Sequence, residues 1–345
     1  MTRLLYYPDY TGGNPYQKLL YKNTSLTNSL CVGPGSLFDA INIAKDGEAC
    51  IFHQHWINAY FQGLKTEKEA MHIVTDLKYR LQYFRSLGGT IVWTIHNTIN
   101  HASRFTSADK ALRHFLAVAS DLVHIHETAH FSRVSYLGIN PLDVVICPHP
   151  SYFGYYGDFQ FNQRLTQVRH ASSRRTALFL GSLRVNKDPS AIVAMANHLA
   201  EKGFRVTIAG MPEDSSVLNI LTSGLVESEN LHLLLRRLTE NEIHELCSNH
   251  NIGMISYDEI LTSGTIELYN SYGMACIDCR SLQGGKRSLD ALFLRLSEIE
   301  DSENLAEILE KHCINSYFQA IEKSGCSFLN SHPFKSLLSG HLEGA

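Results

Sequence analysis

Short apolar runs alternate along the chain with longer segments in which apolar residues recur every three or four positions. The short runs are rich in β-branched and aromatic residues, and the longer segments have the period of an amphipathic helix. This alternation is typical of α/β proteins with parallel sheets. The predicted strands are 4–7, 49–53, 90–95, 122–126, 144–147, 177–180, 205–209, 231–235, 252–256 and 275–278. The predicted helices are 15–22, 67–87, 108–119, 189–202, 240–249 and 265–272.

The alternation is interrupted near the middle of the chain. An aromatic, glycine-containing stretch at 152–158 and a polar stretch at 162–175 break the pattern, and we interpret them as a linker. After residue 302 the pattern is helical only. We therefore expect an α/β protein with two Rossmann-like domains facing across a cleft, at 1–160 and 161–301, and a helical tail at 302–345. In such domains ligands bind beyond the carboxyl ends of the strands.

Composition narrows the classes of protein. A length of 345 residues suits two domains with separate cores. A net charge of −4 lacks the basic excess of a nucleic-acid-binding protein. No segment reaches the roughly 18 apolar residues of a membrane span, and Pro8 interrupts the start too early for a signal peptide, so we expect a cytoplasmic protein. The eight cysteines, including the pair Cys276 and Cys279, are expected to be reduced core thiols.

A hydroxyl-rich turn precedes the predicted helix 265–272. Ser263, Gly264 and Thr265 can cap this helix and leave its first amide groups facing an anion, which makes the turn a candidate phosphate site. Glu267, in the first turn, can accept hydrogen bonds from a ribose diol, and Glu259 lies on the preceding loop. The ordinary interpretation is an N-cap followed by a carboxylate that complements the helix dipole.

A second loop at 180–189 follows the first strand of the second half. Gly181 and Ser182 open it, and Arg184 and Lys187 supply two cations. Arginine binds phosphate in a bidentate manner and lysine acts as a point charge, so both suit a nucleoside diphosphate. The alternative is a pair of solvated cations. Because the sequence contains no Asp-x-Asp pair, a metal ion on the diphosphate is not implied.

Histidines end several predicted strands of the first half. They are His53, His55, His96, His124, His126 and His149. If the sheet is parallel, these ends converge on one rim, and we expect three of the four strand ends to line the cleft. A metal site is the rival inference, because His-x-His places two rings on one face of a strand. No carboxylate follows at the spacing that such a site needs.

Other polar residues of the first half lie on loops after strands. Asp9 can act as a base, and His96 can act as general base or can remain a hydrogen-bonded structural residue. Asn14 before Pro15 is the start signal of a helix. The residues expected to bind sugar or acceptor are Gly12, Gly13, Asn14, His55, Asn97 and His101.

With these motifs the chain resembles GT-B fold glycosyltransferases of the retaining, GT4-like group. The spacing of Glu259 and Glu267, the loop 181–187 and the segment 273–277 look like that group's donor-domain signature. A closer likeness is to bacterial exopolysaccharide mannosyltransferases of the xanthan β-mannosyltransferase type. It is carried by residues 14–16, 53–56, 93–97, 101, 183–187 and 263–265.

The resemblance implies transfer of a sugar, most plausibly mannose from GDP-mannose, to a glycan or polyprenyl-diphosphate-linked acceptor in surface polysaccharide synthesis. It implies donor phosphates on Arg184, Lys187 and residues 263–265, ribose on Glu267, no metal cofactor, and a tail that returns to the first domain. The chain departs from the signature at Thr262, where the group has Gly, and at Ala275, where it has Pro.

These departures leave the stereochemistry open. A retaining enzyme would use Glu259 and His96 around the sugar, whereas an inverting one needs Asp9, His96 or His101 as base. The alternatives in other classes are a nucleotide-sugar epimerase on the same fold and a catalytically silent glycan-binding partner. The basic amphipathic segment 66–87 can rest on the cytoplasmic face of a membrane or, as we favour, pack on its own sheet.

Overall fold

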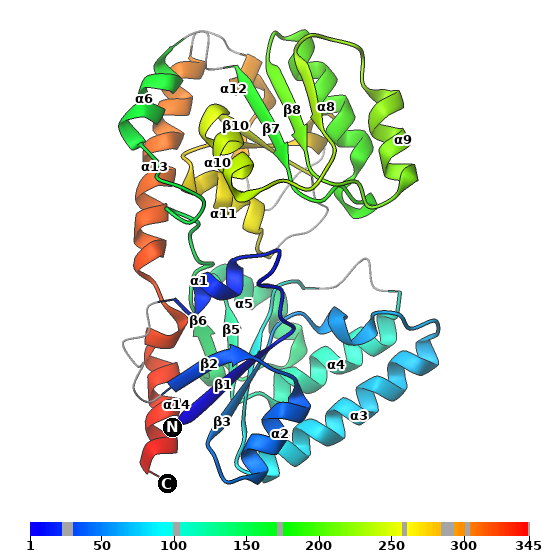
Figure 1. Ribbon diagram of the computed structural model, residues 1–345, viewed down its shortest axis with the longest axis vertical. Helices are drawn as coiled ribbons and strands as arrows, with labels where there is room; N and C mark the ends of the chain where they lie inside the picture. Colours follow the sequence, from blue (N-terminus) through cyan, green and yellow to red (C-terminus); the bar gives the residue numbers. More distant parts are fainter. Residues whose placement is uncertain are drawn as a thin grey trace. The chain divides into compact units, whose positions relative to one another are not determined.

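The computed structural model describes residues 1–22, 30–98, 104–170, 175–256, 261–283, 293–300 and 304–343, with side chains to 338 (Figure 1). These residues form two compact units. The first contains residues 1–150, Leu261, Thr262 and the chain from Cys326 onward, and the second contains the remainder of 151–325. The second unit thus begins before the expected boundary at residue 160, and the tail is divided between both units.

The first unit is built on a six-stranded sheet in which every strand is parallel to its neighbours, in the order β2-β1-β3-β4-β5-β6. Its strands are β1 (Thr2–Tyr7), β2 (Leu30–Pro34), β3 (Cys50–Gln54), β4 (Thr90–Thr94), β5 (Leu122–Ile125) and β6 (Val144–Ile146). Its helices are α1 (Tyr16–Leu20), α2 (Leu37–Lys45), η1 (Ile57–Phe61), α3 (Glu67–Ser86), α4 (Thr106–Ala119), α5 (Thr128–Val134), η2 (Ser135–Leu137), η3 (Pro141–Asp143), η7 (Phe328–Asn330) and α14 (His332–Glu343).

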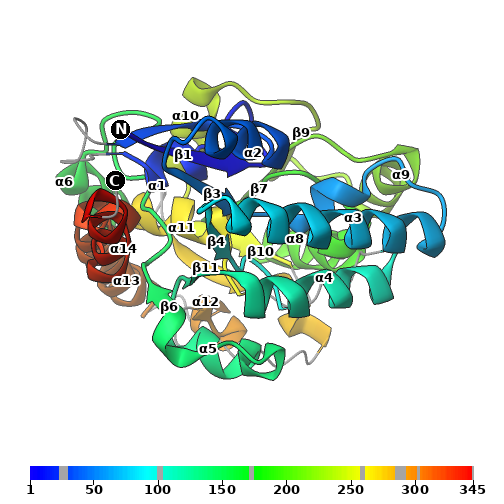
Figure 2. The ribbon, with the colours of Figure 1, turned by 90° about the horizontal axis from the view of Figure 1, so that it is seen from below.

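Both faces of this sheet are covered, and alternate strand residues point to opposite faces. Phe52, Ile91 and Trp93 pack into one core with α2, α3 and α4. Ile51 and Val92 pack into the other core with α1, η7 and α14. Figures 1 and 2 show α3 and α4 side by side on their face of the sheet. The chain from Cys326 onward therefore supplies one cover of the first sheet.

Helix α3 packs on its own sheet, as we favoured from its sequence. Its buried residues recur at helical spacing and pack in the same apolar core as residues of α2 and α4. These positions are Ala70, Val74, Leu77, Leu81 and Phe84. Among the helices that the structure describes, none has the length and apolar character needed to cross a membrane.

No strand was predicted around Gly33 and Pro34. The structure has the end of β2 there, paired with β1, followed directly by α2. Ser36 begins α2 through a reciprocal capping box with Asp39. The edge strand β2 was not predicted because glycine and proline have low strand propensity.

The second unit contains a second parallel sheet, in the order β12-β11-β10-β7-β8-β9. Its strands are β7 (Thr176–Leu180), β8 (Arg205–Ala209), β9 (Leu231–Leu234), β10 (Ile252–Ile255), β11 (Ala275–Asp278) and β12 (Phe293–Leu294). Its helices are α6 (Phe161–Arg169), η4 (Val185–Lys187), α8 (Pro189–Glu201), α9 (Ser215–Gly224), α10 (Glu240–Asn249), α11 (Gly264–Ser271), η5 (Cys279–Gln283), α12 (Leu296–Glu300) and α13 (Leu305–Gly325).

Helix α6 corrects the prediction of a linker at 162–175. This mostly polar helix buries Val168 and Arg164, and the Arg164 side chain is 2% exposed. This guanidinium donates to the carbonyl oxygens of Tyr272 at 2.9 Å and His250 at 2.7 Å, and to Asn251 Oδ1 at 2.9 Å. Most arginines are exposed, so the sequence predicts a surface position for Arg164. Its burial is possible because the guanidinium has hydrogen-bond partners.

Candidate functional site

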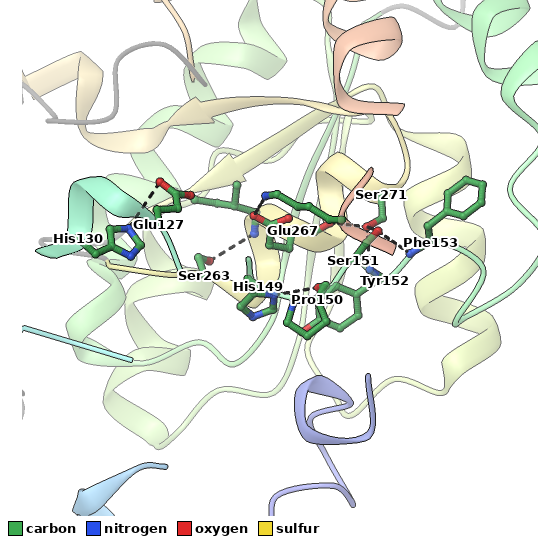
Figure 3. A network of polar contacts seen from close by, with 12 residues as sticks. Glu127, His130, His149, Pro150, Ser151, Tyr152, Phe153, Ser263, Glu267 and Ser271 are labelled. Carbon is green, nitrogen blue, oxygen red and sulfur yellow. Dashed lines mark hydrogen bonds and ion pairs between the residues drawn. The ribbon is translucent and has the colours of Figure 1, made fainter. Parts of the chain in front are cut away.

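The hydroxyl-rich turn of the second unit begins α11, close to the predicted start. Ser263 is the N-cap, and its Oγ accepts a hydrogen bond from the amide of Ile266 at 3.3 Å. Gly264 and Thr265 are half-buried in the first turn. Figure 3 shows Ser263 at the start of this helix, with Glu267 and Ser271 further along it. The first amide groups of α11 are thus held in the orientation that an anion needs.

Gly181 brings the two predicted loops together. It ends β7 with φ +131°, and a Cβ at this position would lie 3.2 Å from Lys187 Nζ and 3.8 Å from Thr265 Oγ1. A Cβ on Gly210, with φ +144°, would lie 1.9 Å from the Gly181 carbonyl oxygen. Glycine is therefore required at 210 by the approach of the Gly181 backbone, and it is favoured at 181 by the positive φ. One ammonium group, one hydroxyl and the bare Gly181 backbone meet at the carboxyl end of β7.

Lys187 reaches this point from η4, one residue before a strained cap. Asp188 has φ +44° and caps α8 through a 3.1 Å hydrogen bond from the amide of Ala191 to its Oδ1. Lys187 Nζ also lies 5.8 Å from the ring centroid of Phe179. Arg184 on the same loop is exposed, as is Ser182. The structure thus brings Lys187 to the start of α11 and leaves these two side chains in solvent.

Tyr269 fixes α11 against the sheet. Its hydroxyl donates to the carbonyl oxygen of Leu178 and accepts from the amide of Leu180, both at 2.9 Å. Its ring covers Gly253 of β10, where a Cβ would lie 2.1 Å from the ring. The sequence gave no functional signal for Tyr269, yet this buried residue sets the distance between α11 and the end of β7.

Glu267 has a partner that the sequence analysis missed. It is 9% exposed, and its Oε1 accepts a 2.6 Å hydrogen bond from Lys323 Nζ of α13. The two residues lie 56 positions apart, so no local spacing connects them. The carboxylate predicted to bind ribose is therefore already oriented by a cation.

The strand-end histidines of the first unit do converge, and they form one buried layer. Alternate residues of β3, β4, β5 and β6 point to the face of the sheet that α1 and η7 cover. On this face the strands first place the apolar residues Ile51, Val92, Leu122 and Val145, and the histidines lie two or four residues further along. We call the six residues the histidine layer: His53, His55, His96, His124, His126 and His149. Phe328 of the tail lies against it, with ring centroids 4.9 Å from those of His53 and of His124.

Hydrogen bonds to neutral groups connect most rings of the layer. Tyr21 Oη lies 2.8 Å from both His53 Nδ1 and His55 Nε2. Tyr16 Oη lies 2.9 Å from His126 Nε2. Burial is the first cause that lowers the pKa of His53, His55, His96, His124 and His126, to about 4 for His124. These five rings are therefore neutral near pH 7.

His96, the predicted base, lies at the outer edge of the layer. It is 8% exposed, and its Nε2 lies 3.1 Å from His55 Nδ1. Its ring stacks on Trp56 with centroids 4.0 Å apart and an angle of 12° between the planes. Trp56 and Tyr16, which also contacts the His96 ring, were not among the predicted site residues. The layer holds His96 in a defined plane with a small accessible edge.

The rival inference of a metal site finds no support in the described part of the chain. Within those residues, no group of three or more His, Cys, Asp or Glu side chains is placed to hold a metal ion. The nitrogens of His53 and His124, for example, make hydrogen bonds to hydroxyl and carbonyl oxygens.

The remaining predicted residues of the first unit lie on exposed loops. Asp9 Oδ1 accepts from both the amide and the hydroxyl of Thr11, at 2.9 and 2.6 Å. Asn14 Oδ1 accepts from the amide of Tyr16 at 3.0 Å, which is a helix-start contact. Gly12 and Gly13 are exposed. Asn97 is also exposed, and its carbonyl oxygen accepts a hydrogen bond from Arg113. Glu259 and His101 lie outside the described residues.

Comparisons with known proteins give structural likeness at low sequence identity. No protein-family profile matches the sequence, and a search of curated proteins found no match. Anabaena HepE, crystallised with UDP and glucose, is similar over 100% of both chains, with a TM-score of 0.56 and 10% identity.

Two further structures share the arrangement. An α,α-trehalose-phosphate synthase (UDP-forming) from Burkholderia xenovorans matches 89% of this chain and 77% of its own, with a TM-score of 0.51 and 11% identity. A Listeria monocytogenes protein named as a UDP-N-acetylglucosamine 2-epimerase matches 100% and 97%, with a TM-score of 0.51 and 11% identity. Together with the two parallel six-stranded sheets, these likenesses show that the chain has the two-domain α/β fold called GT-B.

Proposed function

We propose that this protein is a nucleotide-sugar-dependent glycosyltransferase whose second unit binds the donor. The observation that carries the proposal is the meeting of Gly181, Lys187 and Thr265 at the carboxyl end of β7. In Rossmann-like sheets this end is where nucleotides bind. A likeness of fold to proteins crystallised with UDP or named as UDP-forming is consistent with it.

The chemistry of this site suits a diphosphate. Lys187 supplies a positive charge, the first amides of α11 supply donors, and the missing side chain at Gly181 lets an anion approach the backbone. A preorganised hydrogen-bond donor that faces a departing diphosphate lowers the activation free energy by about 3 kcal/mol. We therefore assign leaving-group stabilisation to Lys187 and the 263–265 turn, with Arg184 and Ser182 completing the donor site and no metal ion required.

We assign the ribose hydroxyls to Glu267, whose carboxylate is oriented by Lys323. In the first unit we assign the sugar or the acceptor to His96, Asn97 and the Gly12–Asn14 loop, with Glu259, Asp9 and His101 as further candidates for the chemistry. The predicted sugar contact of His55 is corrected, because this residue is 1% exposed and both of its ring nitrogens are bonded to Tyr21 and His96. GDP-mannose remains the donor that we favour from the sequence resemblance. The acceptor that we favour is a glycan or a lipid-linked oligosaccharide of surface polysaccharide synthesis.

Calorimetry tests the donor site directly. GDP, UDP, GDP-mannose and UDP-glucose are titrated into the wild type, Lys187→Ala and Glu267→Ala, each with and without a chelator. We expect binding of at least one nucleotide, loss of that binding in both variants, and no effect of the chelator. Lys202→Ala is the matched control, because Lys202 is an exposed lysine at the end of α8 in the same unit. Unchanged affinity in both site variants would refute the site.

A nucleotide-sugar epimerase is the second candidate, because the fold is shared with the Listeria protein named for that activity. Product analysis separates the two functions. A transferase releases the nucleoside diphosphate when an acceptor is present, whereas an epimerase interconverts the nucleotide-sugar without one. Donor binding with neither reaction would favour a silent glycan-binding protein.

A further inference from the structure

Six hydrogen-bond contacts run without a break through the histidine layer. In each contact the donor and acceptor atoms lie 3.1 Å apart or less. In order they are His124 Nε2 to Cys147 O (2.9 Å), Thr94 Oγ1 to His124 Nδ1 (3.0 Å), His53 Nε2 to Thr94 Oγ1 (2.7 Å), Tyr21 Oη to His53 Nδ1 (2.8 Å), His55 Nε2 to Tyr21 Oη (2.8 Å) and His96 Nε2 to His55 Nδ1 (3.1 Å).

The carbonyl of Cys147 sets the direction of this chain at its inner end. A carbonyl oxygen only accepts, so Nε2 of His124 must carry the hydrogen. A neutral imidazole has one N–H, so Nδ1 of His124 is bare and accepts from the hydroxyl of Thr94. That hydroxyl has a single hydrogen, so its oxygen accepts from Nε2–H of His53.

The same argument continues outward. Nδ1 of His53 is bare and accepts from the Tyr21 hydroxyl, whose only hydrogen is then used. The Tyr21 oxygen accepts from Nε2–H of His55, and the bare Nδ1 of His55 accepts from Nε2–H of His96. Each imidazole thus carries hydrogen on Nε2 and none on Nδ1. The chain therefore has one consistent direction, and it ends at the bare Nδ1 of His96.

Neutral rings are required for this argument, and the surroundings keep them neutral. Thr94, His53 and His124 are fully buried, and burial lowers the pKa of each imidazole in the chain. Arg113 acts on His96 in the same direction as burial. The neighbouring aromatic groups, Phe328 and Trp56, carry no charge.

We propose that this one-way chain holds His96 as a single neutral tautomer, with hydrogen on Nε2 and a bare Nδ1 that accepts a hydrogen bond from a sugar hydroxyl. Within the described residues Nδ1 of His96 has no hydrogen-bond partner, and it does not belong to the fully buried unpaired atoms. Stacking on Trp56 fixes the plane in which it points. Thr94, Tyr21, His53, His55 and His124 are positioning residues. The part about the sugar rests on the proposed function, whereas the tautomer does not.

Long-range nitrogen–proton NMR of the histidine side chains reads the tautomer near pH 7. In the wild type we expect one Nε2–H form for His53, His55, His96 and His124. A proton on Nδ1 of His96, or a mixture of both forms in the wild type, would overturn the proposal. This spectrum needs no substitution, so it stands even where a variant fails to fold.

Variants then test whether the chain is the cause, because the Nε2–H form is also the commoner one in free histidine. Thr94→Val removes the hydroxyl that sets the direction, so the outer part of the chain can reverse. We expect the two ring nitrogens of His96 to move to intermediate shifts. Thr94→Ser keeps the hydroxyl and restores the wild-type spectrum, and Tyr21→Phe produces the mixture again. A single tautomer in Thr94→Val and in Tyr21→Phe would contradict the proposal.

Kinetics with GDP-mannose and UDP-glucose connect the tautomer to function. A two-form mixture halves the competent population, so we expect kcat to fall about twofold or more in Thr94→Val, with recovery in Thr94→Ser. Binding of GDP and UDP, measured by calorimetry, should not change, since that site lies in the other unit. If neither nucleotide binds the wild type, the proposed function fails while the NMR result still decides the tautomer. An altered tautomer with unchanged kcat would reject the contact between His96 and the sugar.

Discussion

We expect the histidine layer to make the first unit sensitive to mild acid. Five of its members have lowered pKa values, with burial as the largest cause: His53, His55, His96, His124 and His126. In the unfolded chain these groups take up protons as the pH falls through the ordinary value of 6.5, whereas in the folded protein they stay neutral. Their contribution to stability is therefore complete above that pH and is lost as the pH falls toward the folded values.

The size of the loss follows from His124. Its pKa is lowered from 6.5 to about 4, and this difference amounts to about 3 kcal/mol. Each histidine that is protonated only in the unfolded chain adds about 1.4 kcal/mol per pH unit to the slope, so five give roughly 7 kcal/mol per pH unit at most. A domain is stable by about 5–15 kcal/mol. We expect the first unit to unfold at about pH 5–6.

Tryptophan fluorescence isolates this unit, because both tryptophans of the chain, Trp56 and Trp93, lie in it. Urea unfolding at a series of pH values gives the slope. His124→Gln should reduce the slope by about 1.4 kcal/mol per pH unit whatever it does to the stability at neutral pH. His72→Gln, at an exposed position on α3, is the control with an unchanged slope. A stability independent of pH between about 7 and 5, or an equal slope in His124→Gln, would refute the reasoning.

Three predictions concern the second unit. Gly181→Ala should abolish nucleotide binding in calorimetry, because its Cβ falls 3.2 Å from Lys187 Nζ at a strained φ, whereas Gly325→Ala, whose Cβ meets open space in the same unit, should leave it unchanged. Tyr269→Phe removes two hydrogen bonds to β7 and should lower the free energy of unfolding by about 1–3 kcal/mol in urea titration. Arg164→Leu removes the hydrogen bonds to three buried acceptors and should cost more than Tyr269→Phe in the same assay, so a smaller loss would contradict the anchoring role of Arg164.

The sequence predicted the central strands of both sheets and the start of α11 correctly. It also predicted the edge strands β6 and β9, but it missed the edge strands β2 and β12, which are short, and β2 contains glycine and proline. It also missed α6, a nine-residue helix with a mostly polar sequence that buries Arg164 and Val168. Periodicity detects elements that bury a long regular face, and its signal is weak in a short helix with few apolar positions.

The candidate site shows the same division. Ser263 and Lys187 were recognisable because a cap signal and a cationic loop are local patterns. The partner of Glu267 was not, since Lys323 lies 56 residues away and only the path of α13 brings it near. The histidines were visible as strand ends, whereas their burial and common direction depend on Tyr21 and Thr94 from other elements.

The sequence by itself determined the parallel α/β architecture, the two Rossmann-like halves and the residues at the ends of the strands. These features follow from the alternation of side chains along one strand and the periodicity along one helix. Only the tertiary structure decided which of those residues meet. Gly181 and Lys187 belong to one loop and Thr265 to the start of α11, and their approach depends on the packing of Tyr269 against β7 and β10. Contacts between distant segments are set by packing and hydrogen bonds that no local pattern contains.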